Sequence, residues 1–587
     1  MAGTKACVMN KGDIAAIFDE MADILDTLGE DPFRVNSYRR AARVLRDTTA
    51  DLAALAAEGK LTVLPGVGKS TAEKIAEYLK TGHVTRHEEL RAKVPAGLLE
   101  LLRVQGLGPK TAGKLWHEAK ITSLEELREA LDKDPRRLLG IEGLGEKKLA
   151  LMREALQFAE ATVGRFLLHQ AQRLAEDLLA AVGAARGVRR AEAAGSLRRR
   201  RETIGDIDIV CQADAKHAQA AMDAFAAAPG VQKTIARGET KCSVVLPGPF
   251  QADLRIVPEE SYGAALAYFT GSKAHNVALR TLALKHKLHL NEYGLFVQAG
   301  GGKTGRRLAG QDEEGIYKAL KLAWIPPELR EDRGEIGAAA AGKLPHLIEP
   351  GDIRGDLQMH TTASDGANTI EEMVRACRDA GYKYLAITDH SRSQRQANGL
   401  DEKRLRAHAA AIRAAAKKFP DMLVLAGVEV DILKDGTLDF ADEVLRELDF
   451  VMASPHAALN QGRQEATRRL IRAIENPCVH ALGHPSGRLL NQRPGMEIDI
   501  EPIARAATAR NVALEINADP HRLDLRDVHV KAAIDAGAKL VISTDAHRAG
   551  DLAVMTYGVS TARRGWASAA NVVNTFTPQA LKKWLAR

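Results

Sequence analysis

The 587-residue sequence contains 45% hydrophobic and 27% charged residues, the composition of ordinary globular protein, which excludes a disordered or fibrous chain. Its formal net charge of +7 favours a polyanionic partner but is modest for this length. Aromatic residues make up only 4%, which argues against a protein that mainly stacks single-stranded bases, and the length allows about four domains.

The cysteines and the apolar pattern indicate a protein of the cytoplasm. The five cysteines are scattered without CxxC spacing, as is typical of reduced thiols rather than disulfides or zinc ligands. The first residues become charged before any signal-peptide core, and no apolar run reaches the roughly 18 residues of a membrane span. We therefore expect a cytoplasmic protein without membrane contact.

Residues 1 to about 160 show short amphipathic helices separated by glycine-containing turns. Three turns resemble one another, and each places a Gly-apolar-Gly sequence before a helix that carries lysine: Gly66/Gly68, Gly106/Gly108 and Gly143/Gly145. Glycine permits a tight turn, and a helix start offers unpaired N–H groups to a phosphate. The pattern resembles the helix-hairpin-helix motif, which binds the DNA backbone without reading sequence. The third copy, followed by Glu146, is the one that a plain turn between helices explains best.

From about residue 188, strand-like segments alternate with alanine-rich helices, which predicts an α+β unit. Within GSLRRRRETIGDIDIV, Asp206 and Asp208 are two residues apart and therefore project from one face of a strand. Asp253 in QADLRIV is expected to join them from a neighbouring strand. Three carboxylates at one edge suit two Mg²⁺ (or Mn²⁺) ions for in-line nucleotidyl transfer, and the turn at Gly195 and Ser196 suits a triphosphate.

This order of motifs resembles the family X DNA polymerases, with similarity to DNA polymerase beta over about the first 325 residues. The resemblance implies triphosphate contacts from Ser196, Arg199 and Gly205. The segment YFTGSKAHNVALRTLALKHKLHLNEYGLF resembles the thumb of that family. It implies nucleotide contacts from Tyr268, Phe269, Gly271 and Asn276, and a template contact from Arg280. Lys273 stands where the beta enzyme has an acidic residue, so the contacts to the incoming base are expected to differ.

The segment FRVNSYRRAA resembles the 5′-phosphate pocket of the beta enzyme, with Arg34, Tyr38 and Arg39 in matching places. Lys74 matches the Schiff-base lysine of its deoxyribose-phosphate lyase, a role that requires a lowered pKa. A second lysine that supports this pocket is replaced by Ser70. Lyase chemistry and a lysine that only contacts DNA or solvent therefore remain alternatives.

After a predicted linker over 326–350, strand-then-helix repeats predict one α/β barrel rather than several domains. Potential metal ligands follow successive predicted strands: His360, Asp365, His390, Glu429, His456, His484, Asp545 and His547. The carboxyl ends of barrel strands line one pocket, and mixed imidazole and carboxylate ligands suit Mn²⁺, Zn²⁺ or Fe²⁺.

The barrel set resembles the polymerase and histidinol phosphatase (PHP) domain, a trinuclear metal phosphoesterase fold, from about residue 350 to the end. The resemblance matches eight of nine usual ligand positions and implies two or three ions. Gln358 stands where the domain commonly has a histidine, so one ion is expected to be weaker or absent. Arg488 is a weaker candidate for binding a substrate phosphate.

Together these features predict a multidomain chain: a helical lyase-like region over 1–90, a helical fingers-type region over 91–160, an α+β nucleotidyltransferase palm over 161–262, a thumb over 263–325, the linker, and a distorted TIM-like α/β PHP barrel over 351–587. The expected function is that of a monomeric DNA repair polymerase that fills short gaps with dNTPs on gapped or nicked primer-template DNA. The barrel is expected to act as a 3′–5′ exonuclease or to process 3′-blocked or abasic ends.

Three other functions are alternatives to this prediction. One is a PHP-type phosphoesterase fused to a DNA-binding module with weak or no polymerase activity. The others are a small-molecule phosphoesterase and a non-enzymatic DNA-binding scaffold. The phosphate-binding turns and the DxD pattern favour DNA over a small substrate, and the complete acidic triad favours an enzyme over a scaffold.

Overall fold

The computed structural model describes residues 11–48, 52–64, 66–95, 97–102, 107–146, 148–149, 152–153, 165–248, 250–298, 304–491 and 495–586. Its contacts divide the chain into two compact units. The first is Met1–Val163 with Lys233–Ala236 and Val245–Phe250, and the second is Gly164–Gln232, Arg237–Val244 and Gln251–Arg587. Within the described residues, no helix is long and apolar enough to cross a membrane.

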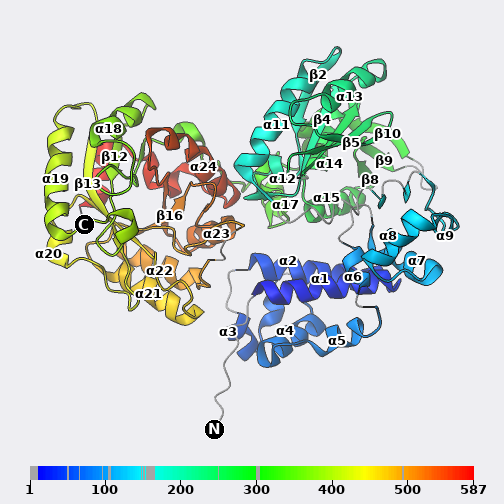
Figure 1. Ribbon diagram of the computed structural model, residues 1–587, viewed down its shortest axis with the longest axis horizontal. Coiled ribbons are helices and arrows are strands. Elements are labelled where there is room, and N and C mark those ends of the chain that lie inside the picture. Colours follow the sequence, from blue (N-terminus) through cyan, green and yellow to red (C-terminus); the bar gives the residue numbers. More distant parts are fainter. Residues whose placement is uncertain are drawn as a thin grey trace, which may run out of the picture. The chain divides into compact units, whose positions relative to one another are not determined.

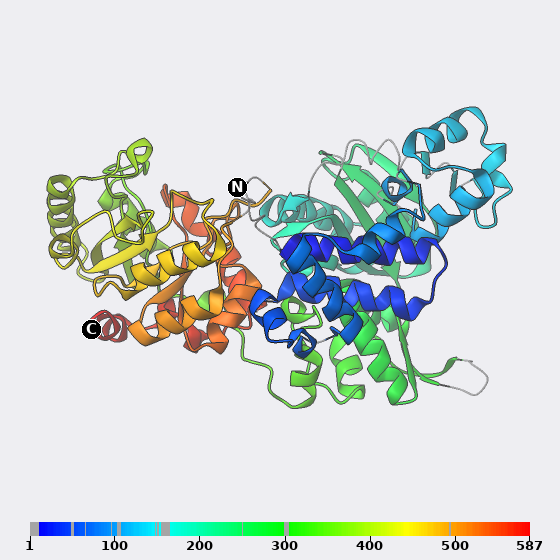
Figure 2. The same cartoon turned by 90° about the horizontal axis from the view of Figure 1, so that it is seen from below.

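The first unit is built from helices whose apolar faces share one core, with Phe18 and Leu45 among its fully buried side chains. The helices α1 and α2 lie side by side (Figure 2). The elements are α1 (Lys11–Thr27), α2 (Pro32–Asp47), α3 (Leu52–Ala57), η1 (Leu61–Val63), α4 (Lys69–Thr81), α5 (Thr85–Arg91), α6 (Leu98–Leu101), α7 (Pro109–Ala119), α8 (Leu124–Lys133) and α9 (Arg136–Leu139). This packing places two of the glycine turns directly before α4 and α7.

The second unit begins with the palm, whose main sheet has the strand order β2-β4-β7-β6-β5. Strands β2 and β4 are antiparallel, whereas β4 and β7 are parallel. The elements are β1 (Phe166–Leu167), α11 (Leu168–Gly183), β2 (Val188–Ala193), α12 (Gly195–Arg198), β3 (Thr203–Ile204), β4 (Asp206–Ala213), η2 (Ala215–His217), α13 (Ala218–Ala226), β5 (Lys233–Arg237), β6 (Lys241–Leu246) and β7 (Phe250–Val257). Four of the five cysteines are described, and these four are free and buried.

The thumb follows as helices around a three-stranded sheet of order β10-β9-β8. Its elements are η3 (Glu259–Ser261), α14 (Tyr262–Thr270), α15 (Lys273–Lys285), β8 (Leu288–Asn291), β9 (Gly294–Gln298), β10 (Thr304–Ala309) and α16 (Glu313–Ala319). The connection expected to be a linker contains η5 (Pro327–Leu329) and α17 (Glu335–Ala340). Arg330, Glu331 and Glu335 within it are buried. This segment is therefore a folded connection, held by buried charges.

The remaining chain forms a parallel α/β barrel of seven strands in sequential order, as the strand-then-helix repeats predicted. A parallel bridge between Met359 and Ala546 joins the two ends of the sheet, so the barrel is nearly closed. Helices lie outside these strands (Figure 1). The strands are β11 (Gly355–Asp356), β12 (Tyr384–Ile387), β13 (Leu423–Asp431), β14 (Phe450–Ser454), β15 (Ala481–Leu482), β16 (Ala513–Asn517) and β17 (Lys539–Ser543).

The barrel strands are almost entirely buried, as expected for parallel strands covered by helices. The helices are η6 (Pro350–Asp352), α18 (Ile370–Asp379), η7 (Arg395–Ala397), α19 (Glu402–Ala416), α20 (Asp442–Leu445), α21 (Arg463–Glu475), α22 (Ile500–Arg510), α23 (Asp527–Asp535), η8 (Ala549–Val554), α24 (Met555–Arg564), η9 (Ala569–Asn571), η10 (Val573–Thr575) and α25 (Pro578–Leu585).

Candidate active sites

Two strands of the palm carry its three acidic residues on one face of the sheet. Asp206 and Asp208 lie two residues apart on β4, and the parallel register sets Asp208 opposite Asp253 of β7. Side chains alternate along a strand, and register partners on parallel strands point the same way. The backbone therefore meets the condition for a shared metal site, and the coordination of two ions there stays a prediction.

The three carboxylates repel one another in the absence of a cation. Burial, with the charges of Asp206 and Asp253, raises the pKa of Asp208 to about 7, and burial with Asp253 raises the pKa of Asp206. Asp253 faces two neighbours that the sequence did not reveal: its Oδ1 accepts a hydrogen bond from Gln251 at 3.0 Å, and its Oδ2 lies 3.2 Å from Nζ of Lys241. Oxygen ligands that destabilise one another in this way fit divalent cations such as Mg²⁺.

The turn after β2 brings the predicted triphosphate donors next to Asp208. Gly195 has a φ of +60°, and a Cβ at this position would overlap Oδ2 of Asp208, so the turn requires glycine. The hydroxyl of Ser196 is buried and has no hydrogen-bond partner among the described residues. A buried hydroxyl without a partner is unusual and fits a donor that awaits a ligand.

The other two predicted triphosphate contacts differ in their surroundings. A Cβ on Gly205 would lie 3.0 Å from the guanidinium of Arg165, so glycine allows this close approach. The guanidinium of Arg199 is already bonded: Nε lies 3.0 Å from Oε1 of Glu331, and Nη1 donates to the carbonyl oxygen of Thr270 at 2.7 Å. Arg199 therefore lies beside the site, but its guanidinium is already paired with the carboxylate of Glu331.

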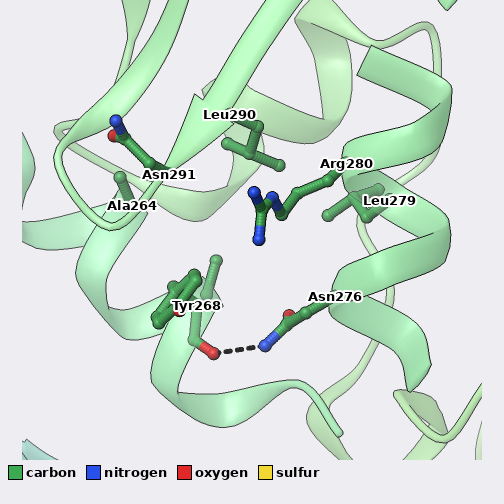
Figure 3. Close-up of a pocket in the computed structure, with 8 residues that line it drawn as sticks. Ala264, Tyr268, Asn276, Leu279, Arg280, Leu290 and Asn291 are labelled. Carbon is green, nitrogen blue, oxygen red and sulfur yellow. Dashed lines mark hydrogen bonds between the residues drawn. The ribbon is translucent and has the colours of Figure 1, made fainter. Parts of the chain in front are cut away.

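The thumb brings three of its predicted nucleotide and template residues, Tyr268, Asn276 and Arg280, to one pocket between α14 and α15. Figure 3 shows the guanidinium of Arg280 pointing into this pocket beside Tyr268 and Asn276. The side-chain amide of Asn276 donates to the carbonyl oxygen of Tyr268 at 2.6 Å and to that of Gly271 at 3.2 Å. Phe269 packs edge-on against Tyr268, with ring centroids 5.2 Å apart. The aromatic pair therefore also contributes to packing.

The N-terminal pocket brings Lys74 next to Tyr38. Nζ of Lys74 donates to Ser70 Oγ at 2.8 Å and lies 5.9 Å from the centre of the Tyr38 ring. Burial lowers the pKa of Lys74, and the charge of Arg34 acts in the same direction, while neighbouring glutamates oppose it. Arg39 instead forms ion pairs with two aspartates of α1, at 3.1 and 3.0 Å. Ser70 thus serves Lys74 as a hydrogen-bond acceptor.

The glycine turns have the geometry expected for phosphate binding where the structure describes them. Gly68 and Gly108 cap α4 and α7, and in neither cap does a side chain accept from the first turn of the helix. Gly66 and Gly143 have positive φ angles of 81° and 85°. Glycine is therefore favoured at both turns. Gly145 is also described, whereas Gly106 lies outside the described residues.

The barrel brings all eight predicted ligands together. Seven of them form overlapping groups whose potential ligand atoms lie within 4.8 Å of one another: His360, Asp365, His390 and His547; His390, Glu429 and His456; His360, Glu429 and Asp545. The eighth, His484, has Nε2 at 3.0 Å from Nε2 of His456 and 3.6 Å from Oε1 of Glu429. Among the described residues, no such group lies in the palm, where Asp253 is turned toward Gln251 and Lys241.

Several potential ligand atoms of this cluster are buried without a hydrogen-bond partner among the residues that the structure describes and are therefore suited to bind metal ions. Nδ1 of His360, Nδ1 of His390 and Oε2 of Glu429 are buried, and each has no hydrogen-bond partner within the described part of the chain. The last two lie only 2.9 Å apart. Lone pairs of nitrogen and oxygen that converge in this way suit a first-row divalent metal.

Two histidines of the cluster, His456 and His547, have a pKa well above the usual range of an imidazole. Burial opposes a charge on His456, but Glu429 and Asp431 outweigh it and raise the pKa to about 10. Asp365 and Asp545 likewise outweigh burial and raise the pKa of His547 to about 9. A strongly acidic pocket of this kind attracts cations.

Several side chains that the sequence did not single out hold these ligands. Asp431 Oδ1 lies 2.6 Å from Nδ1 of His456, and Glu515 Oε2 lies 3.2 Å from Nδ1 of His484. Such partners fix the orientation of an imidazole. Asp431 follows Glu429 by two residues on the same strand, which is the signal that alternation along a strand offers.

The side chains of Gln358 and Arg488 are bonded to other groups of the protein. Gln358 Nε2 donates to Oε1 of Glu429 at 2.9 Å, so at this position a hydrogen-bond donor faces a predicted ligand. Arg488 is buried and pairs with Glu202 of the palm at 2.8 Å, while it also donates to the carbonyl oxygen of Leu523. This guanidinium is thus occupied in a structural ion pair between the palm and the barrel.

Comparison with known proteins gives four family matches: the DNA polymerase beta thumb over residues 265–331, a helix-hairpin-helix domain over 9–84, a SAM-like helix-hairpin-helix tandem over 98–157, and the PHP domain over 356–519. The chain is 38% identical over 581 residues to the DNA polymerase/3'-5' exonuclease PolX of Bacillus subtilis (strain 168), which covers 99% of this chain and 100% of that protein.

The barrel also resembles smaller proteins. A probable phosphatase of Shewanella sediminis is 29% identical over 242 residues, which is 40% of this chain and 93% of that protein. One of Acetivibrio thermocellus is 33% identical over 166 residues, which is 28% of this chain and 64% of that protein. The order of all parts together is thus the order found in the Bacillus protein.

Proposed function

The chain belongs to the family X DNA polymerases that carry a C-terminal PHP domain, and we propose that its palm fills short DNA gaps while its barrel removes 3′ nucleotides. The observation that carries the proposal is the pairing of two separate ligand sets in one chain. One is the acidic triad on β4 and β7, and the other is the eight-residue cluster at the barrel strand ends.

In the palm, Asp206, Asp208 and Asp253 would hold two Mg²⁺ (or Mn²⁺) ions, which lower the pKa of the primer 3′-hydroxyl and neutralise the leaving pyrophosphate. The hydroxyl of Ser196 and the backbone at Gly195 donate to the triphosphate, and Arg199 adds a charged contact. The nucleotide sugar packs on the aromatic pair that ends α14.

The thumb pocket supplies the remaining nucleotide contacts. The amide of Asn276 turns from the backbone to the minor-groove edge of the incoming base, and Arg280 reaches the template. Gly271 leaves room for the side chain of Asn276, because a Cβ there would overlap the amide oxygen. Gly205 likewise leaves room for the guanidinium of Arg165 beside the acidic triad, because a Cβ at this position would lie 3.0 Å from it.

In the barrel, the eight ligands would hold two or three ions of Mn²⁺, Zn²⁺ or Fe²⁺, which supply a water nucleophile for phosphodiester hydrolysis. The chain orients these ligands through Asp431 and Glu515, and Gln358 weakens one ion position because it donates a hydrogen bond instead of a lone pair. Abasic or blocked 3′ ends are further substrates of this site.

The N-terminal helices would bind gapped or nicked DNA as a monomer in the cytoplasm. The helix starts after Gly68, Gly108 and Gly145 contact backbone phosphates, and the turns at Gly66 and Gly143 allow the close approach. Arg34, Tyr38 and Arg39 would bind the 5′-phosphate, and Arg39 would first have to leave the two aspartates with which it is paired.

The experiment separates the two sites. Asp206→Ala should abolish primer extension on gapped DNA with Mg²⁺, because it removes a central metal ligand, and should leave Mn²⁺-dependent 3′ degradation intact. Asp365→Ala with His547→Ala should do the reverse. Extension that survives Asp206→Ala would refute the palm assignment and favour a PHP phosphoesterase on a DNA-binding module. Persistent degradation in the double variant would refute the barrel assignment.

A second activity, removal of a 5′-deoxyribose phosphate, is favoured by the lowered pKa of Lys74 beside Tyr38. Borohydride should trap the wild-type chain on gapped DNA with a 5′-deoxyribose phosphate, whereas Lys74→Ala should lose at least about tenfold of the adduct. Lys80→Ala, in the last turn of the same helix, is the matched control. Equal trapping by wild type and Lys74→Ala would show that Lys74 only contacts DNA.

A further inference from the structure

A helix of the barrel contacts the palm loop that carries Ser196 and Arg199. Arg564, the last residue of α24, donates from Nη1 to the carbonyl oxygen of Arg199 at 2.6 Å. Arg200 adopts a left-handed φ of +56°, and its Nε donates to Oγ of Ser560 on the same helix at 3.1 Å. Because this φ is unfavourable for a residue with a side chain, the loop depends on such contacts from outside.

Arg564 and Arg199 also share one buried carboxylate. Oε1 of Glu331 lies 3.0 Å from Nε of Arg199 and 3.1 Å from Nη2 of Arg564, and it lies 3.6 Å from Nη1 of Arg201. The side chains of Glu331 and Arg564 are 8% and 4% exposed. Coulomb interactions among these groups are therefore weakly screened by solvent.

The charges of this cluster are unequal. Asp527 of α23 pairs with Arg564 at 2.6 Å and with Arg333 at 2.9 Å. Four guanidinium groups thus face two carboxylates, so positive charge is in excess within this cluster. A surplus of this kind is suited to the binding of an anion.

Removal of one cation would redistribute the others. Without Arg564, the Glu331 carboxylate would be left with Arg199 and Arg201, and a buried carboxylate that loses a partner binds its remaining partners more tightly. Arg199 would then be drawn toward Glu331. The carbonyl oxygen of Arg199 would lose its hydrogen bond at the same time.

We propose that Arg564 of the C-terminal barrel is a positioning residue for nucleotide binding in the palm, a role that rests on the proposed contact of Arg199 with the triphosphate. Arg564 holds the backbone of Arg199 and takes up part of the Glu331 charge. The guanidinium of Arg199 thereby stays available to an incoming triphosphate. The barrel serves the polymerase reaction in addition to its own nuclease site.

The test is the steady-state KM for dNTP on gapped DNA. Arg564→Gln should raise KM roughly tenfold with a smaller change in kcat, because ground-state binding of the triphosphate is impaired. Arg564→Lys keeps a buried cation and so the fold, but one ammonium reaches fewer of the three acceptors, and it should raise KM by about threefold. Mn²⁺-dependent 3′ degradation should stay unchanged in both variants, since Arg564 is not a ligand of the barrel cluster.

Arg563→Gln is the matched control. This neighbouring arginine pairs with Glu328 at 2.7 Å and donates to the carbonyl oxygen of Ile348, so it joins α24 to the same connecting segment, 326–350, without touching Arg199 or Glu331. Its loss should leave the KM for dNTP within about twofold of wild type. If KM rises as much as in Arg564→Gln, then the loss of any contact of α24 raises KM, the effect is not specific to Arg564, and the proposal is overturned.

Charge rescue gives a signature that a purely structural role would not produce. In Arg564→Gln with Glu331→Gln, the carboxylate that draws Arg199 away is neutral, so KM should return to within about threefold of wild type. A KM that rises further in the double variant would overturn the proposal. Arg199→Gln tests separately whether Arg199 contacts the triphosphate. An unchanged KM for dNTP in this variant would refute that contact. A raised KM in Arg199→Gln, together with a normal KM in the Arg564 variants, would refute only the positioning role of Arg564.

Discussion

Two histidines of the barrel, His456 and His547, carry protons that a metal ion must displace. Their acidic neighbours outweigh burial, so the pKa of His456 is about 10 and that of His547 about 9. Both imidazoles are therefore protonated at pH 8 without metal. Because these pKa values exceed the ordinary 6.5, the ion pairs stabilise the metal-free fold fully below pH 6.5, and this stabilisation is lost as the pH rises through 9 to 10.

We expect Mn²⁺ binding at pH 8 to release about two protons, because a protonated nitrogen has no lone pair to donate to the metal. Affinity should therefore fall as the pH is lowered. Calorimetric titration in two buffers of different ionisation enthalpy measures the protons released, and the Asp206→Ala background removes binding at the palm. His547→Gln should release about one proton fewer. A binding heat that is the same in both buffers would contradict this expectation.

At the scale of secondary-structure elements, the sequence contained the signals that repeat along one strand or one helix. The two-residue spacing of Asp206 and Asp208 predicted a shared face, and the register of β4 with β7 places Asp253 on that face. Alternation also places Gln251, two residues before Asp253 on β7, on this face, whereas the contact of Asp253 with Lys241 of β6 was not predictable. Side-chain contacts of this kind depend on how neighbouring strands are set against each other, which alternation along one strand does not reveal.

The segment 326–350 shows the limit of composition as a guide. Its prolines, glycines and charges predicted a linker, but Glu331 is buried because it pairs with Arg564, which lies 233 residues further along the chain. Local composition describes how easily a segment bends and carries no information about a partner so distant in sequence. For the same reason the sequence, which made Arg488 a weaker candidate for binding a phosphate, did not reveal its ion pair with Glu202.

At the scale of the whole molecule, the thumb, the barrel and the palm apart from residues 233–236 and 245–250 belong to one compact unit, and the N-terminal helices belong to another. Buried ion pairs join the palm to the barrel, as in Arg488 with Glu202 and in the Glu331 cluster. Breaking a buried pair by removal of one partner typically costs about 3–5 kcal/mol. The palm and the barrel should therefore unfold together.

Metal binding in the barrel consequently should protect the palm. A ligand at a hundredfold excess over its Kd stabilises the native state by about 2.7 kcal/mol, so exchange through global unfolding slows roughly a hundredfold. In the Asp206→Ala background, we expect Mn²⁺ to slow hydrogen exchange by the same factor in β4 of the palm and in β13 and β16 of the barrel. Helices α1 and α2, which belong to the other unit, should not change.

Asp365→Ala with His547→Ala in that background should abolish the protection everywhere, because the ion groups at the barrel strand ends lose two ligands. Protection confined to the barrel strands would mean that the palm opens while the barrel stays folded. In that case the buried pairs between palm and barrel would be weaker than their geometry indicates, and each catalytic site would rest on a separately stable domain.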